Sequence, residues 1–235
     1  MEHGPRQWLA RCLSDEFRFL IAAIEPMTPN TTSSLLHGLI AILRGVQPHE
    51  SVAIAQALYD EGFRVIEVPM NSPEPLQSIA LIRQALPADC LVGAGTVLSP
   101  EMAQSVKDAG GQIIIMPHAD TAVIHHAKSL GMWCVPGVAT VTEAFAALAA
   151  GADALKLFPA EQLGVATLKA WMSVLPKGTA ILPVGGVNPD NMQPYVSAGA
   201  KGFGLGSALY KPGQTVEQTR AIAARFQAGW AQLQR

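Results

Sequence analysis

The sequence predicts an α/β fold, a single (β/α)8 TIM barrel preceded by an N-terminal extension. From Leu39 onward, short apolar runs alternate with helical patterns at intervals of roughly 20 to 30 residues, which is typical of βα units built around a parallel sheet. Eight such runs are present, and eight strands are the number that closes a barrel. A chain of 235 residues, 49% of them hydrophobic, is long enough to bury one core of this kind.

The first 34 residues are expected to lie outside the barrel, which then spans residues 35–235. Apolar side chains recur at helical spacing over residues 6–25, and residues 25–34 read EPMTPNTTSS, a composition typical of linkers. We expect this extension to be either helical or poorly ordered, and Met27 offers an alternative start. Its apolar run, FLIAAI, is too short to span a membrane and follows Asp15 and Glu16, which argues against a secretory signal.

The predicted strands follow one another in a regular series, with helix signals between them. Pro48, Pro73 and the run Ser99-Pro100-Glu101 are expected in first turns of helices, and AG or EG pairs before several strands are typical of helix ends. An open doubly wound sheet is the alternative, but GLGS lacks the GxGxxG spacing and lies at the last strand instead of the first. The predicted strands are LIAIL (39–43), VIEVP (65–69), CLVGAG (90–95), IIIMP (113–117), MWCVP (132–136), ALKLF (154–158), AILPV (180–184) and GFGLG (202–206).

Composition excludes several classes of partner. The formal net charge is -2 and no basic block is present, so nucleic acid is not an expected partner; no run reaches membrane-spanning length either. Three widely spaced cysteines fit neither a disulfide framework nor a zinc site, which favours a reducing cytoplasm. The six histidines show no recognised metal spacing, so no metal is expected.

Lys156 lies in the middle of an apolar strand, DALKLFP (153–159). Alternation along a strand would place it on one face with Ala154 and Phe158. A buried ammonium without a partner tends to lose its proton, and a neutral amine is the nucleophile that Schiff-base chemistry requires. The ordinary alternative is a lysine whose charged end reaches solvent or a carboxylate at the end of the strand.

Glu67 interrupts a second apolar strand, and alternation places it on the face of Val65 and Pro69. Barrel interiors are built in layers drawn from alternate strands, so Glu67 on the second strand and Lys156 on the sixth are expected to face each other. Such a pair is either a structural ion pair or an acid/base group beside a nucleophile.

The ends of other strands carry residues suited to binding anions. Loops after the seventh and eighth strands of a barrel often bind phosphate through backbone N–H groups, and a short helix is expected from Ser207. Arg44, after the first strand, could clamp a carboxylate or lie on the surface. Thr96, after the third strand, offers a hydroxyl or a helix cap. The phosphate-binding candidates are Gly185, Gly186, Gly206 and Ser207.

Taken together, IAILRG, EVPMNSP, VGAGTV, KLFPAE, VGGV and GLGSALY resemble the class I aldolases that cleave 2-dehydro-3-deoxy-6-phospho sugar acids, over residues 35–234. The resemblance implies a Schiff base on Lys156, proton transfer by Glu67, no cofactor and no metal, and a homotrimer. It further implies that Arg44 and Thr96 hold the substrate carboxylate and that the glycine turns and Ser207 hold the phosphate. Phe158 and Pro117 are expected to wall the pocket, and Val184 and Asn71 are expected in the pocket as positions that bear on stereoselectivity.

Three positions discriminate between the two branches of this family. The chain looks like the phosphogalactonate branch at Arg44, at Asn71 followed by Ser72, and at Val184. At these three sites, in the same order, the phosphogluconate branch typically has lysine, an arginine-threonine pair and threonine. A hydroxyl at position 184 could select one C4 configuration by hydrogen bonding, and valine cannot.

The resemblance implies a lyase of carbohydrate metabolism that cleaves the phosphogalactonate to pyruvate and glyceraldehyde 3-phosphate during galactonate degradation. The same reaction on the gluconate epimer is the first alternative. A metal-dependent phosphosugar epimerase or isomerase on the same barrel would need a metal constellation that the sequence lacks. A non-catalytic phosphosugar-binding protein would not need Glu67 and Lys156 to face each other.

Overall fold

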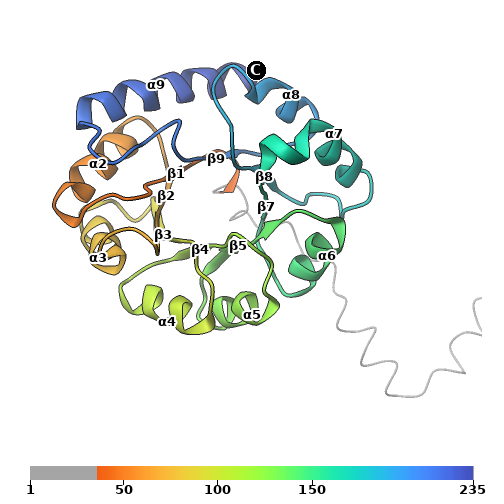
Figure 1. Cartoon of the computed structure of the whole chain (residues 1–235), viewed down its shortest axis with the longest axis horizontal. Coiled ribbons are helices and arrows are strands. Elements are labelled where there is room, and N and C mark those ends of the chain that lie inside the picture. Colours follow the sequence, from red (N-terminus) through yellow and green to blue (C-terminus); the bar gives the residue numbers. More distant parts are fainter. Residues whose placement is uncertain (1–35, 235) are drawn as a thin grey trace, which may run out of the picture. The chain divides into compact units, whose positions relative to one another are not determined.

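The computed structural model describes residues 36–234 of the chain. The helix expected over residues 6–25 and the linker expected over residues 25–34 lie outside the described residues. Strands and helices alternate through the described part, and Figure 1 shows the helices arranged around the outside of the strands.

All strand pairs are parallel and fall in two sheets. The strand order is β5-β4-β3-β2-β1-β9 in one sheet and β6-β7-β8 in the other. The eight predicted runs are confirmed as strands, each within two residues of its observed limits. The bounds are β1 Leu39–Ile42, β2 Val65–Pro69, β3 Leu91–Gly95, β4 Ile113–Ile115, β5 Trp133–Val135, β6 Gly137–Val138, β7 Leu155–Leu157, β8 Ile181–Pro183 and β9 Phe203–Leu205.

The short strand β6 was not predicted. Pro136 separates it from β5, because proline has no N–H to donate to a ladder and its φ is fixed. The chain then changes partner: β5 pairs with β4, whereas Gly137 and Val138 pair with Lys156 and Leu157 of β7.

Backbone hydrogen bonds connect the edges of the two sheets. Near β5 and β7, Asp153 donates to the carbonyl of Cys134 (3.0 Å) and Lys156 to that of Pro136 (2.9 Å). At the other side, Val184, directly after β8, and Gly204 of β9 form an isolated parallel bridge. The parallel strands therefore form one curled surface.

Most helix limits follow the sequence signals. Pro48 begins α2 behind a capping box of Gln47 and Glu50, and the Ser99 side chain accepts from the N–H of Met102 (3.3 Å) at the start of α4. The expectation for Pro73 is wrong, because Glu74 precedes Pro75 and is thereby disfavoured in helix, so α3 starts at Pro75. The bounds are α2 Pro48–Asp60, α3 Pro75–Ala85, α4 Pro100–Asp108, α5 Thr121–Ser129, α6 Val141–Ala149, α7 Ala160–Met172, α8 Met192–Ser197 and α9 Val216–Leu233.

The core has an inner and an outer layer. Leu155 and Leu157 belong to the large cluster that includes buried helix residues, whereas Ala154 belongs to a smaller cluster enclosed by the strands. This division confirms the alternation expected for β7 and leaves Lys156 on the inner face. The inner cluster comprises Leu36, Ile40, Val65, Leu91, Ile113, Ile115, Val135, Ala154, Ala180 and Leu182.

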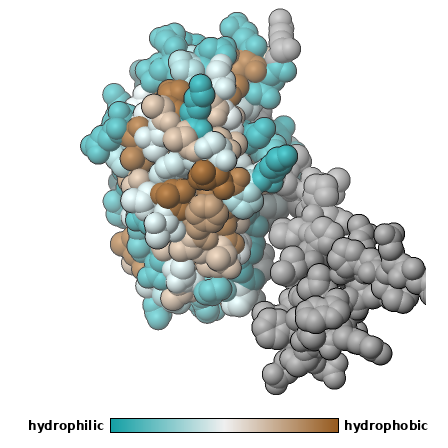
Figure 2. All heavy atoms as spheres, turned by 90° about the vertical axis from the view of Figure 1, so that its right-hand side faces the viewer, coloured by the Kyte–Doolittle hydropathy of each residue, from teal (hydrophilic) through white to brown (hydrophobic). Residues whose placement is uncertain are grey.

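Apolar side chains are exposed on the face shown in Figure 2. Figure 2 shows brown residues gathered on the face occupied by α6 and α7. Phe145 on α6 is 45% exposed, and Val174, which follows α7, is 57% exposed. Among residues 36–234, no helix combines the length and the hydropathy that a bilayer span needs.

Candidate active site

A cavity of about 280 Å³ opens at the carboxyl ends of the strands. Its lining comes from the residues that end β1, β3, β4, β7, β8 and β9 or follow them, which is where parallel α/β barrels carry their chemistry. Ten residues singled out from the sequence line it together: Arg44, Thr96, Pro117, Lys156, Phe158, Val184, Gly185, Gly186, Gly206 and Ser207.

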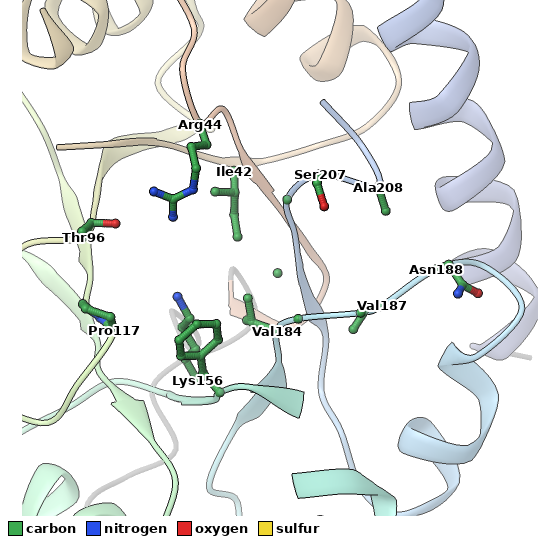
Figure 3. A pocket seen from close by; sticks show the side chains of 15 residues that line it. Ile42, Arg44, Thr96, Pro117, Lys156, Val184, Val187, Asn188, Ser207 and Ala208 are labelled. Carbon is green, nitrogen blue, oxygen red and sulfur yellow. The ribbon is translucent and has the colours of Figure 1, made fainter. Parts of the chain in front are cut away.

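Lys156 rises from β7 into this cavity. Figure 3 shows its amine, the guanidinium of Arg44 and the hydroxyl of Thr96 directed toward the same open space. The residue is 7% exposed, and its Nζ lies 4.5 Å from the centre of the Phe158 ring. Burial lowers the pKa of the Lys156 ammonium; Glu67 opposes this shift and Arg44 adds to it. The environment therefore favours a neutral, nucleophilic amine.

Glu67 is buried and is not among the residues that line the cavity. It is 2% exposed, and its Oε2 has no hydrogen-bond partner among the described residues. Burial raises the pKa of Glu67 from 4.5 to about 7, although Lys156 and Arg44 pull it down. A carboxyl group with this pKa can both accept and donate a proton near neutral pH.

Gly95 makes room for that carboxyl group. A Cβ at this position would lie 1.7 Å from Oε2 of Glu67, so no other residue fits while Glu67 keeps its place. Gly95 ends β3 beside Pro69 of β2, and Thr96 follows it with a left-handed φ of 56°. That conformation, unusual for a β-branched residue, accompanies the placement of the Thr96 side chain in the cavity lining.

Asn71 differs from the expectation that it lines the pocket. It is exposed and absent from the lining, and its side-chain oxygen accepts a hydrogen bond from Nη1 of Arg44 (2.5 Å). The neighbouring Ser72 is buried and accepts from the N–H of Gly45 (2.9 Å). Both contacts fall on the segment that carries Arg44.

The opposite end of the cavity is built from backbone. Gly185 and Gly186 have left-handed φ values of 105° and 69°, which favour glycine. Within residues 36–234, the N–H groups of Gly185, Gly186, Gly206 and Ser207 donate no backbone hydrogen bond outside the strand ladders. Backbone amides presented by turns at the edge of a cavity are suited to an anion.

The expectation of a short helix from Ser207 is wrong. Residues 207–209 form a turn, in which Leu209 and Tyr210 both donate to the carbonyl of Gly206 (2.8 and 3.0 Å). Tyr210 is buried and its hydroxyl donates to Glu50 at the start of α2 (2.9 Å), so the chain turns toward α2 before it can complete a helix.

Five lining residues were missed from the sequence. Alternation along β1 and β9 could have found Ile42 and Gly204, because they lie two residues before Arg44 and Gly206. The other three lie in loops, where periodicity gives no signal. The missed residues are Ile42, Val187, Asn188, Gly204 and Ala208. In the described part of the chain, no three His, Cys, Asp or Glu side chains are grouped as a metal site would require.

Comparison with known proteins identifies close relatives. The family model described as KDPG and KHG aldolase matches residues 34–223. The 2-dehydro-3-deoxy-6-phosphogalactonate aldolase of Escherichia coli (strain K12) is 48% identical over 188 residues, which cover 80% of this chain and 92% of that protein.

Two solved structures share the fold. One, described as a native KDPGal structure, has a TM-score of 0.82 and 44% sequence identity, and the match covers 89% of this chain and 97% of that one. The other is a cube-shaped, porous protein cage designed by fusing symmetric oligomeric domains; its TM-score is 0.82 and its identity 46%, covering 84% of this chain and 73% of that one.

Proposed function

The chain belongs to the KDPG and KHG aldolase family, and from this premise we propose that it is an aldehyde-lyase that cleaves 2-dehydro-3-deoxy-6-phosphogalactonate to pyruvate and glyceraldehyde 3-phosphate. The single observation that carries the proposal is the buried Lys156, whose amine enters a cavity lined by an arginine at one end and by glycine turns at the other. This arrangement matches a substrate with a ketone between a carboxylate and a phosphate.

Lys156 acts as the nucleophile. Its neutral amine adds to the C2 ketone, and loss of water from the resulting carbinolamine gives an iminium ion, which accepts the electron pair of the breaking C3–C4 bond. Glu67 does not line the cavity, so it exchanges protons with the substrate through a water molecule: it supplies the proton for dehydration and then accepts the proton of the C4 hydroxyl. Protonation of the remaining enamine and hydrolysis of the imine release pyruvate and restore the lysine. No metal and no cofactor takes part.

The two ends of the cavity hold the two anionic groups. Arg44 pairs with the carboxylate and Thr96 donates its hydroxyl to the same group, since both lie beside Lys156 (Figure 3). The amides of Gly185, Gly186, Gly206 and Ser207 bind the phosphate. Phe158 and Pro117 form the walls between them. Binding at both ends positions the C3–C4 bond for cleavage.

We assign the galactonate epimer as the preferred substrate. Val184 lines the cavity and presents methyl groups where a hydroxyl would favour the other C4 configuration. The name of the Escherichia coli relative and the description of the native KDPGal structure support the same epimer, which places the enzyme in galactonate degradation.

Turnover of the two epimers tests the assignment. Purified protein is expected to release pyruvate from the galactonate epimer with the higher kcat/KM, and to keep this activity in excess chelator. A higher kcat/KM with the gluconate epimer would reverse the substrate assignment. Activity abolished by chelator would favour the metal-dependent epimerase or isomerase, and binding without pyruvate release would favour the phosphosugar-binding protein.

We also propose that residues 35–235 form one closed eight-stranded barrel, outside which residues 1–34 lie. The hydrogen bonds between β5 and β7 and the bridge between Val184 and Gly204 support closure, and the extent of the family match supports the division.

A homotrimer is our proposal for the assembly, supported by the apolar side chains over α6 and α7 and by the oligomeric domains of the designed cage. The buried free thiols of Cys90 and Cys134 suit the reducing cytoplasm that we propose as its location.

A further inference from the structure

Two turns at the mouth of the cavity are joined by side chains. Arg44 and Gly45 follow β1, and Asn71 and Ser72 follow β2, its neighbour in the sheet. Asn71 accepts from the Arg44 side chain and Ser72 accepts from the Gly45 backbone. The turn after β2 therefore holds the turn after β1 at two points, the side chain of Arg44 and the backbone N–H of Gly45.

The bond to Asn71 occupies only one part of the guanidinium. Nη1 of Arg44 donates to Oδ1 of Asn71, which leaves the edge formed by Nε and Nη2 available. An arginine can bind a carboxylate bidentately through such an edge. Long exposed side chains otherwise lose considerable rotamer entropy when they are held in one geometry. Asn71 thus restricts the arginine while keeping its binding edge free.

The backbone beneath Arg44 is fixed from two sides. Ser72 is 8% exposed, and its hydroxyl accepts the Gly45 N–H. On the other side Gly45 packs against Pro212, where a Cβ would lie 2.7 Å from Cγ, and its φ of 82° is left-handed. The root of the Arg44 side chain is therefore held between the turn after β2 and the loop after β9.

We propose that Asn71 and Ser72 are positioning residues that hold Arg44 for the substrate carboxylate. Neither touches the cavity: both act through the segment that carries the arginine. This inference rests on the proposed function of the site, in which Arg44 pairs with the carboxylate. It predicts that the turn after β2 contributes to the affinity for the substrate carboxylate and does not contribute to the affinity for the phosphate.

The test is a double-mutant cycle read by calorimetry with pyruvate alone and with inorganic phosphate alone. Asn71→Ala is expected to raise the Kd of pyruvate about five- to tenfold, the usual contribution of one net hydrogen bond, with the Kd of phosphate unchanged. Arg44→Ala is expected to raise the pyruvate Kd further. In the Arg44→Ala background, Asn71→Ala is expected to add nothing, because its effect passes through the arginine.

Ser72→Ala and a surface control complete the series. Ser72→Ala is expected to raise the pyruvate Kd about two- to fivefold, less than Asn71→Ala, since the Pro212 contact remains. Gln104→Ala, which removes an exposed side-chain bond to Asp108 on α4, is expected to leave both Kd values unchanged.

Several results would overturn the proposal. It is wrong if Asn71→Ala raises the pyruvate Kd equally with and without Arg44, or if Asn71→Ala also raises the phosphate Kd. It is also wrong if Asn71→Ala or Arg44→Ala binds pyruvate like the wild type. Wild-type pyruvate binding by Ser72→Ala would remove Ser72 from the pair. Cleavage of the sugar acid by the wild type is measured separately. A wild type that binds pyruvate without cleaving would remove the proposed function and leave the positioning result standing.

Discussion

The two ends of the cavity are built by different means. At the imine end, charged side chains come from strands: Lys156 from β7 and Glu67 from β2, both almost fully buried. At the proposed phosphate end, the candidate binding groups are backbone amides in turns after β8 and β9, and Gly186 is exposed. The first end shifts proton affinities by desolvation, and the second presents donors without changing any charge.

This difference separates chemistry from binding. A buried amine and a buried carboxyl group are costly, because each must be desolvated, and that cost gives the reactive protonation states. Amides at a turn are pre-organised and need no desolvated charge of their own. Changes to Lys156 or Glu67 should therefore lower kcat, whereas changes to the glycine turns at the phosphate end should raise KM.

The largest effect is expected for Lys156→Met. Methionine fills the same volume without an amine, so no imine can form, and cleavage should fall to the background of the assay, a loss of at least about 10⁴-fold in kcat. Stopped-time pyruvate release measures it. Lys169→Met, at an exposed position on α7, should keep wild-type turnover; residual kcat within tenfold of wild type in Lys156→Met would contradict the nucleophile assignment.

Glu67→Gln should have the next largest effect. Glutamine keeps the shape against Gly95 but cannot exchange the proton, so kcat should fall about 10² to 10⁴-fold, the usual contribution of general acid/base catalysis. KM should change little, because the side chain does not line the cavity. The exposed Glu101→Gln serves as control. Unchanged kcat would leave Glu67 as a structural group only.

Gly186→Ala tests the contribution of the phosphate end of the cavity to KM. The left-handed φ and a Cβ that would lie 2.5 Å from Oε2 of Glu161 force this turn to shift, which displaces amides from the phosphate. KM for the sugar acid should rise about 10- to 100-fold, as expected for lost bonds to a charged group, with kcat within a few-fold of wild type. The matched control is Gly178→Ala, at an equally left-handed glycine with nothing within 4 Å of its Cβ. A fall in kcat without a change in KM would break the distinction between the two ends.

A fourth prediction concerns stability instead of turnover. Because burial raises the pKa of Glu67 from 4.5 to about 7, the folded protein binds this proton more tightly than the unfolded chain. The stabilisation is present below pH 4.5 and is lost as the pH rises to about 7. Glu67→Gln lacks this dependence, so its free energy of unfolding relative to wild type should increase by about 3 kcal/mol across that interval. Urea unfolding at pH 5 and pH 8 measures it, and a difference independent of pH would contradict the raised pKa.

The two ends also differ in how far the sequence predicts them. Alternation along a strand is enough to place Lys156 on the inner face, and the eight strand segments follow from their apolar runs. Val187 and Asn188 could not be predicted, because a loop has no period to interpret. Nor could the bond from Arg44 to Asn71, which joins residues 27 positions apart through side chains with many rotamers. Strand β6 was also not predicted, because the apolar run is continuous in the sequence and gives no sign that Pro136 interrupts the strand ladder there.

Borohydride reduction in the presence of pyruvate, followed by peptide mass analysis, tests the central claim most directly. The account predicts one reduced pyruvate adduct per chain, on the peptide that contains Lys156, and none in Lys156→Met. An adduct on another lysine, or none under conditions that trap a known Schiff-base aldolase, would contradict the assignment of this buried amine as the nucleophile.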